Sequence, residues 1–169
     1  NQVIRGEGTV DGGIDTTAAT TGAELTPGAA GSGDPGALST GTLQLSGAVT
    51  YTVDLNGNTA GTGHDQLTVT GGVDLGNAVL DLTLDAGYTP TSSDELIIIS
   101  NDLADAVTGT FAGLPEGTVV TLNNGTANFL FTMTYVGGDG NDVSLVSAGQ
   151  AETEAVSYTH LRAHETPIN

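Results

Sequence analysis

Cysteine, tryptophan and lysine are missing from this chain of 169 residues, and Arg5 and Arg162 are its only basic residues apart from three histidines. The lack of cysteine suits a chain that crosses an oxidising periplasm, because no thiols can mispair there. Against the two arginines stand 20 acidic residues, which give a formal net charge of −18. We therefore expect no nucleic acid and no acidic membrane surface as a partner.

Long apolar runs are missing as well. No stretch reaches the ~18 apolar residues that a membrane-spanning helix needs, so we expect no membrane insertion by this segment. The chain is nevertheless not too polar to fold, because 37% of its residues are hydrophobic and 26 more are glycine. A chain of this length and composition can bury one core.

Apolar residues recur at every second position between Gly41 and Leu145, with Gly, Asn, Asp or Pro between the runs. This period is typical of β-strands, and helical periodicity is absent. The parity of the apolar positions changes across Gly76 and Asn77, where a bend or bulge would keep both runs facing one core. Residues 129–135 alternate bulky side chains and hold three of the seven aromatic residues of the chain.

Residues 1–40 are rich in glycine, alanine and threonine, a composition that a flexible tether would also have. They contain short runs of threonine and aliphatic residues between glycines. Including the next such run, the anchors Val10, Leu25 and Leu43 are 15 and 18 residues apart. Such runs suit the rungs of a β-solenoid, each stable only when stacked on its neighbours. We therefore interpret the anchors as marking successive rungs.

Six short motifs follow one another along residues 3–146. They read GEGTVDGGI, ELTPG, DPGALSTGTLQLSGAVTYTVDLNG, HDQLTVTGGVDLGNAVLDL, VTGTFAGLPEGT and FTMTYVGGDGNDVSL. In this order they resemble the C-terminal part of the passenger region of autotransporter-associated β-strand-repeat proteins. The resemblance implies a large bacterial surface or secreted protein whose passenger is a right-handed parallel β-helix. A complete member would also carry a membrane barrel or a sorting signal, which we expect outside the present sequence.

These observations together predict an all-β fold, the end segment of a right-handed parallel β-solenoid. Residues 1–40 would form glycine- and threonine-rich rungs, and residues 41–146 a strand-rich segment whose last block, residues 111–145, caps the stack. Residues 147–155 would be a linker. The alternative is a compact β-sandwich or jelly roll of residues 41–146 with the first 40 residues as a tether.

The C-terminal residues differ in composition from the rest of the chain. Residues 156–166 read VSYTHLRAHET and contain two of the three histidines. This string resembles the translation of a transposon end and adapter used to prepare sequencing libraries. We therefore interpret residues 156–169 as a non-native tail, the alternative being a short amphipathic helix. His64 is then the only native histidine.

A first candidate calcium loop lies in the middle of the chain. Asp54, Asn56, Asn58 and Asp65 occupy positions 1, 3, 5 and 12 of a twelve-residue oxygen-donor loop. Position 6 is Thr59 rather than the required glycine, and position 12 is Asp rather than Glu. A strand-end loop without calcium is the alternative.

A second candidate calcium segment, GGDGNDVSL, spans residues 137–145. It resembles one nonapeptide of a calcium β-roll, and Asp139 and Asp142 would be its ligands. Ser144 takes an apolar position of that pattern, and one copy supplies only part of a coordination shell. A tight turn before the last strand is the alternative interpretation of this segment. For the chain as a whole, we expect no cofactor other than calcium.

The sequence offers no convincing catalytic constellation. His64 and Asp65 form the only histidine–acid pair of the native part, and a triad needs a third partner that the fold would have to supply. The many carboxylates could include a glycosidase pair, but most lie at strand ends and turns, where a solvated surface is expected. A polysaccharide lyase would need a cationic group, and Arg5 is the only candidate. We nominate no catalytic residue.

The predicted function is therefore structural. We expect a non-enzymatic, adhesin-like segment of a bacterial surface-exposed or secreted passenger, located outside the cell and stacked on upstream rungs of the same protein. The alternative is a carbohydrate-binding adhesive module, with glycans as partners, or a fragment of a polysaccharide-acting enzyme. Sugar sites usually present aromatic faces. Of the six aromatic residues before the expected non-native tail, only Tyr51 and Tyr88 fall outside the core-like final block, and Tyr51 follows the inward parity.

Overall fold

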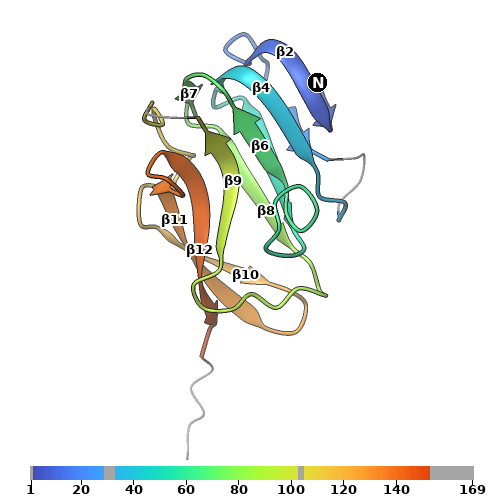
Figure 1. The fold of residues 1–169 in the computed structure, drawn as a ribbon, viewed down its shortest axis with the longest axis vertical. Coiled ribbons are helices and arrows are strands. Elements are labelled where there is room, and N and C mark those ends of the chain that lie inside the picture. The colour runs from blue at the N-terminus through green and yellow to red at the C-terminus, as the bar shows by residue number, and fades with distance from the viewer. Residues whose placement is uncertain (1, 29–32, 103–104, 153–169) are drawn as a thin grey trace, which may run out of the picture.

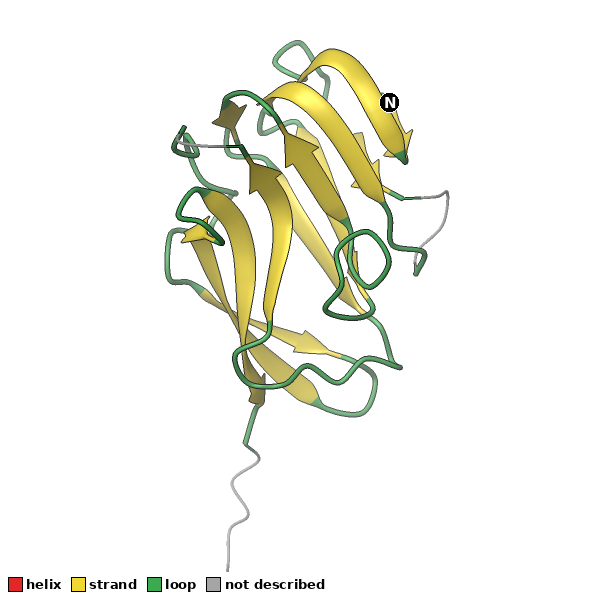
Figure 2. Ribbon diagram, in the orientation of Figure 1, coloured by secondary structure: helices red, strands yellow, loops and turns green. Residues whose placement is uncertain are grey.

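The computed structural model describes residues 2–28, 33–102 and 105–152, and in these ranges all regular structure is β-strand, without a helix (Figures 1 and 2). The expected adapter-derived tail, residues 156–169, lies outside the described residues. The strands are β1 (Val3–Gly6), β2 (Gly8–Asp15), β3 (Ala23–Pro27), β4 (Ala37–Gln44), β5 (Val49–Leu55), β6 (Gln66–Val69), β7 (Val73–Asp74), β8 (Val79–Leu84), β9 (Glu95–Asn101), β10 (Val119–Asn123), β11 (Asn128–Gly137) and β12 (Asp142–Gln150).

The strands form two sheets between which the chain winds. One sheet has the order β1-β3-β5-β8, and the other has the order β10-β11-β12-β9-β6-β4-β2, with β7 paired to β4. From β1 to β9 the chain alternates between the sheets, and strands that are neighbours within a sheet run parallel. The result is a β-solenoid of about three stacked turns. A jelly roll is excluded, because its sheets are antiparallel.

The register corrects the expected rungs. Val10 and Leu43 lie on β2 and β4 of one sheet, whereas Leu25 lies on β3 of the other. Spacings of 15 and 18 residues are thus half-turns. Complete turns are longer: Val3 pairs with Glu24, a step of 21 residues. The expectation was wrong because alternating apolar residues mark a strand whichever sheet it joins, so the pattern repeats twice in each turn.

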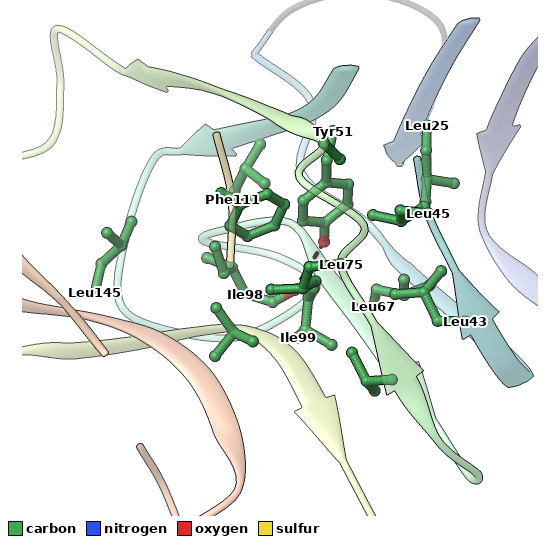
Figure 3. Packing of buried hydrophobic residues seen from close by; sticks show 14 of the residues in the cluster. Leu25, Leu43, Leu45, Tyr51, Leu67, Leu75, Ile98, Ile99, Phe111 and Leu145 are labelled. Carbon is green, nitrogen blue, oxygen red and sulfur yellow. Dashed lines mark hydrogen bonds between the residues drawn. The ribbon is translucent and has the colours of Figure 1, made fainter. Parts of the chain in front are cut away.

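The core lies between the two sheets (Figure 3). Leu25 and Tyr51 reach it from β3 and β5, and Leu43, Leu67 and Ile99 reach it from the opposite sheet, all fully buried. Burying large aliphatic and aromatic side chains stabilises each by about 1.5–3 kcal/mol. The stacked rungs therefore share one continuous hydrophobic interior.

The change of parity at Gly76 and Asn77 is a left-handed turn, as expected. Their φ angles are 50° and 60°, and the residues on either side, Leu75 and Ala78, are both fully buried. A Cβ on Gly76 would lie 2.1 Å from the carbonyl oxygen of Leu45. Glycine is required here because the turn passes directly over the backbone of the previous rung.

Parallel stacking ends at β9. The next strand in that sheet, β12, pairs with β9 antiparallel, β11 pairs antiparallel with β12, and β10 with β11. The alternating side chains of β11 point into the core, with Phe129, Phe131 and Met133 at most 2% exposed. This antiparallel meander lies at the opposite end of the stack from β2 (Figure 1).

The expected linker, residues 147–155, begins too early. β12 continues through Gln150, and Ser147 pairs with Phe131 and donates its N–H to the carbonyl of Asp94 at 2.8 Å. The segment lacks large apolar residues, so its composition resembles a linker, but its backbone hydrogen bonds keep it in the sheet. Only residues after Gln150 lie beyond the last strand.

Candidate functional site

Asp65 lies just before β6, and its carboxylate accepts hydrogen bonds from the backbone instead of facing other ion ligands. Its Oδ1 accepts the N–H of Gly36 at 2.8 Å, and its Oδ2 accepts the N–H of Asp54 at 2.9 Å. The side chain thereby ties the connection before β4 to the end of β5. The pKa of Asp65 is raised to about 6, mainly by burial and also by the carboxylates of Asp54 and Asp34, against the lowering effect of these two hydrogen bonds.

The other members of the first calcium candidate do not converge. Asp54 is 2% exposed and its Oδ2 accepts the N–H of Gly33 at 2.7 Å, while its Oδ1 is buried without a hydrogen-bond partner. The amide nitrogen of Asn56 donates to the carbonyl of Gly33 at 2.9 Å, and Asn58 is exposed. The structure therefore brings Asp54 and Asp65 together as loop anchors and leaves Asn58 outside.

His64 lies buried between two carbonyl groups. Its Nδ1 is 3.2 Å from the oxygen of Gly57, and its Nε2 is 3.2 Å from the oxygen of Ile97. A neutral imidazole has one N–H, so it can donate to only one of them at a time. Burial lowers the pKa of His64, against the effect of both carbonyls. The ring and the Asp65 carboxylate thus have separate partners, which is not the arrangement of a catalytic dyad.

The second calcium candidate is split between surface and interior. Asp139 is exposed in the turn between β11 and β12, whereas Asp142, at the start of β12, is buried and accepts the N–H of Asn101 at 2.8 Å. Burial raises the pKa of Asp142. In the described part of the chain, no three His, Cys, Asp or Glu side chains are grouped so that they could hold a metal ion.

A small acidic hollow lies on the outer face of the β1-β3-β5-β8 sheet. Its volume is about 210 Å³, and Glu24, Asp54 and Asp81 contribute its carboxylates. Arg5 also lines it and forms an ion pair with Glu24, with 2.9 Å between Nη2 and Oε1. The cation that a lyase would need is therefore already neutralised.

The two tyrosines considered for sugar binding are both at least partly buried. Tyr51 is fully buried and donates its hydroxyl to the carbonyl of Ile98 at 2.8 Å. Tyr88 is partly buried, and its hydroxyl lies 3.3 Å from Asp94. Tyr51 therefore cannot present an aromatic platform for a sugar, and Tyr88 packs partly against the core.

The two ends of the solenoid differ, and the register of the strands locates the open end. Within the described residues, β1 and β2 are the outermost strands of their sheets, each paired on one side only. Most side chains of β2 are exposed, and Val3 on β1 is 53% exposed. A hollow of about 340 Å³ opens beside them, lined partly by Ile4 and Ala23. This open end carries two parallel strand edges with unpaired backbone groups.

Comparisons with protein-family models, with curated proteins and with solved structures found no match. Among the described residues no helix is long and apolar enough to cross a membrane.

Proposed function

We propose that this protein is a non-enzymatic scaffold segment that terminates a longer β-solenoid in a bacterial surface-exposed or secreted passenger. The observation that carries the proposal is the difference between the two ends of the stack. At one end the edges of β1 and β2 are unpaired, and at the other end the larger sheet continues past β9 into an antiparallel meander while β8 is the edge of the smaller sheet.

The open end supports stacking on upstream rungs of the same protein. In a parallel sheet, alternate N–H and C=O groups of a strand point to each neighbour, so half of those of β2 face away from β4. An isolated protein usually protects such an edge with charges, bulges or covering loops. β2 carries only the charges of Asp11 and Asp15 and a register shift between Val10 and Gly13. A further parallel rung would satisfy the outward groups.

The other end supports a terminating role. A solenoid needs an end unit that covers the apolar interior of its last rung. Phe111, Phe129 and Phe131 are buried at this end and supply large aromatic side chains that cover the core of the last rung. The meander thereby separates the core from solvent and replaces the parallel edge of β9.

The charge and the resemblance support an extracellular location. A net charge of −18 keeps neighbouring molecules apart and opposes association through strand edges. The sequence motifs resemble the C-terminal part of a bacterial passenger, where a terminating segment belongs. In this role the protein would hold a distal region away from the cell and would act through its shape.

Duplication of one rung tests the proposal. A second copy of residues 23–48 placed before Val3 would add two strands in the chain order of the present turns. We expect a higher melting temperature and slower hydrogen exchange at the outward-facing amides of β2. A matched copy with aspartate at Leu25, Leu38 and Leu43 cannot enter the core and serves as the control. Unchanged exchange with the intact copy would show that the open end does not accept a rung.

A further inference from the structure

Two buried asparagine side chains near the end of β9 each have an unpartnered oxygen. Asn101, the last residue of β9, is 3% exposed, and Asn141, just before β12, is 6% exposed. The Oδ1 atoms of both are buried and have no hydrogen-bond partner. Leaving a buried polar atom unpaired costs about 1–3 kcal/mol, so two of them close together point to an unassigned partner.

The orientation of both amides is fixed by their nitrogen atoms. The Nδ2 of Asn101 donates to the carbonyl of Asp105, and the Nδ2 of Asn141 lies 3.2 Å from that carbonyl and 3.3 Å from the carbonyl of Asp102. Turning either amide over would place its oxygen against these acceptors. The oxygens are therefore the atoms that remain available, and the shared carbonyl of Asp105 keeps the two side chains close to each other.

Asp142 adds a carboxylate to the same place. It follows Asn141 in the chain, is 5% exposed, and accepts the backbone N–H of Asn101 through Oδ1. Burial raises the pKa of Asp142, as do the carboxylates of Asp139 and Glu95, against the hydrogen bonds that Asp142 accepts from the backbone of Asn101 and Asp139. Arg5, the one Lys or Arg in the described ranges, is on β1 at the other end of the stack and pairs with Glu24. The negative charge at this cluster has no basic side chain to balance it.

We propose that Asn101 Oδ1, Asn141 Oδ1 and the carboxylate of Asp142 form a calcium site, with water molecules completing the coordination shell. Amide and carboxylate oxygens are the ligands that calcium prefers, and it accepts six to eight of them in irregular geometry. With one buried carboxylate and two neutral donors the site should be weak, with a Kd on the order of 10⁻⁴–10⁻³ M, as in extracellular modules.

This site differs from both sequence candidates. It excludes Asp139, which is exposed, and it recruits Asn101 from 40 residues before Asn141. Calcium there would fasten the end of β9 to the start of β12, which is the junction where parallel stacking changes to antiparallel pairing. The ion would therefore stabilise the closed end of the solenoid.

Calorimetric titration of the chelator-treated full chain with CaCl2 tests the proposal, with MgCl2 and NaCl at matched ionic strength as controls. We expect saturable calcium binding and a melting temperature about 3–6 °C higher in 10 mM calcium than in chelator. Asp142→Asn keeps the acceptor for the N–H of Asn101 and removes the charge, so both effects should be lost. Asp54→Asn, at another buried carboxylate, should leave both unchanged.

A second variant covers the case in which Asp142→Asn folds poorly. Asn141→Asp adds a charged ligand, so the melting temperature should fall in chelator, and at least tenfold tighter calcium binding should restore it. Asn58→Asp adds the same charge at an exposed position and should have neither effect. If the wild-type chain shows no binding heat and no thermal shift, or if Asp54→Asn abolishes them, the assignment is wrong and the two amide oxygens bind only water.

Discussion

The ring of Phe111 lies parallel to the ring of Tyr51, with 6.0 Å between their centroids and 7° between their planes (Figure 3). Tyr51 is on β5 of one sheet, and its hydroxyl donates to Ile98 on β9 of the other. Phe111 follows β9 and is fully buried against this tyrosine. The pair thus joins the two sheets and the terminal segment at one point in the core.

Tyr51→Phe should lower the free energy of unfolding by about 1–3 kcal/mol. The substitution keeps the ring and its stacking on Phe111, but it removes the buried donor to the carbonyl of Ile98. Equilibrium denaturation in urea measures the change. Tyr88→Phe is the matched control, because the hydroxyl of Tyr88 is only partly buried and its contact with Asp94 is long at 3.3 Å. Equal losses in the two variants would argue against a special role of the bond that crosses the core.

Phe111→Ala should cost about 3–5 kcal/mol, because it leaves a cavity between Tyr51 and Tyr135 that the surrounding strands cannot fill. It should also expose residues of the meander to hydrogen exchange before those of β4 and β6. Val119→Ala, at a side chain that is 58% exposed, is expected to change stability by less than about 0.5 kcal/mol. A loss below about 1 kcal/mol at Phe111 would mean that the terminal segment is not part of the cooperative core.

The contribution of Asp65 to stability should decline as the pH rises from about 4 to 6, because the folded protein holds the proton of Asp65 up to a pKa of about 6, against an ordinary value of 3.8. Below pH 3.8 both states are protonated at this group. In the window above it, the unfolded chain releases the proton first, so unfolding becomes easier by at most about 1.4 kcal/mol per pH unit. Urea denaturation at a series of pH values measures the slope.

The variant Asp65→Asn should flatten the contribution of this group to the slope. The control is Asp15→Asn, since the hydrogen bonds of Thr17 lower the pKa of Asp15 and place its effect below pH 4. A slope that Asp65→Asn leaves unchanged would assign the pH dependence to other carboxyl groups.

Gly76→Ala should destabilise the protein far more than Gly113→Ala. Both glycines have positive φ angles, 50° and 71°, so both variants bear the cost of about 1 kcal/mol for a left-handed alanine. Only at Gly76 would the new Cβ also meet a backbone atom, the oxygen of Leu45, whereas nothing lies within 4 Å at Gly113. The difference between their melting temperatures measures the close approach of the rungs. Equal effects would show that the left-handed conformation alone requires the glycine.

The period of the sequence predicted the strands and the bend, because both depend on local residues. Alternation of apolar side chains gives a strand by itself, and Gly76 with Asn77 is a turn whatever surrounds it. The assignment of strands to sheets was not predictable in this way. Val10, Leu25 and Leu43 have the same local pattern, and only the pairing of β2 with β4 and of β1 with β3 distinguishes half-turns from rungs.

The ligands of the calcium site were likewise not predictable from local residues. Spacing selected Asp139 because it lies close to Asp142 in the chain, but a loop can place neighbours on opposite sides of its surface. Asn101 has no local signal, since a lone asparagine after an apolar strand usually marks a turn. The contact between Asn101 and Asp142 arises only when β12 pairs with β9.

Because pairing changes from parallel to antiparallel at β9, the structure of the closed end is separate from the number of turns in the stack. Contacts of the last turn involve β9, β12 and their neighbours, and none depends on how many turns precede β3. Whole turns could therefore be gained or lost upstream by duplication or deletion of one coding unit, while the same end structure is kept. The length of such a rod can thus evolve in steps of one turn while the strands that close its end stay the same.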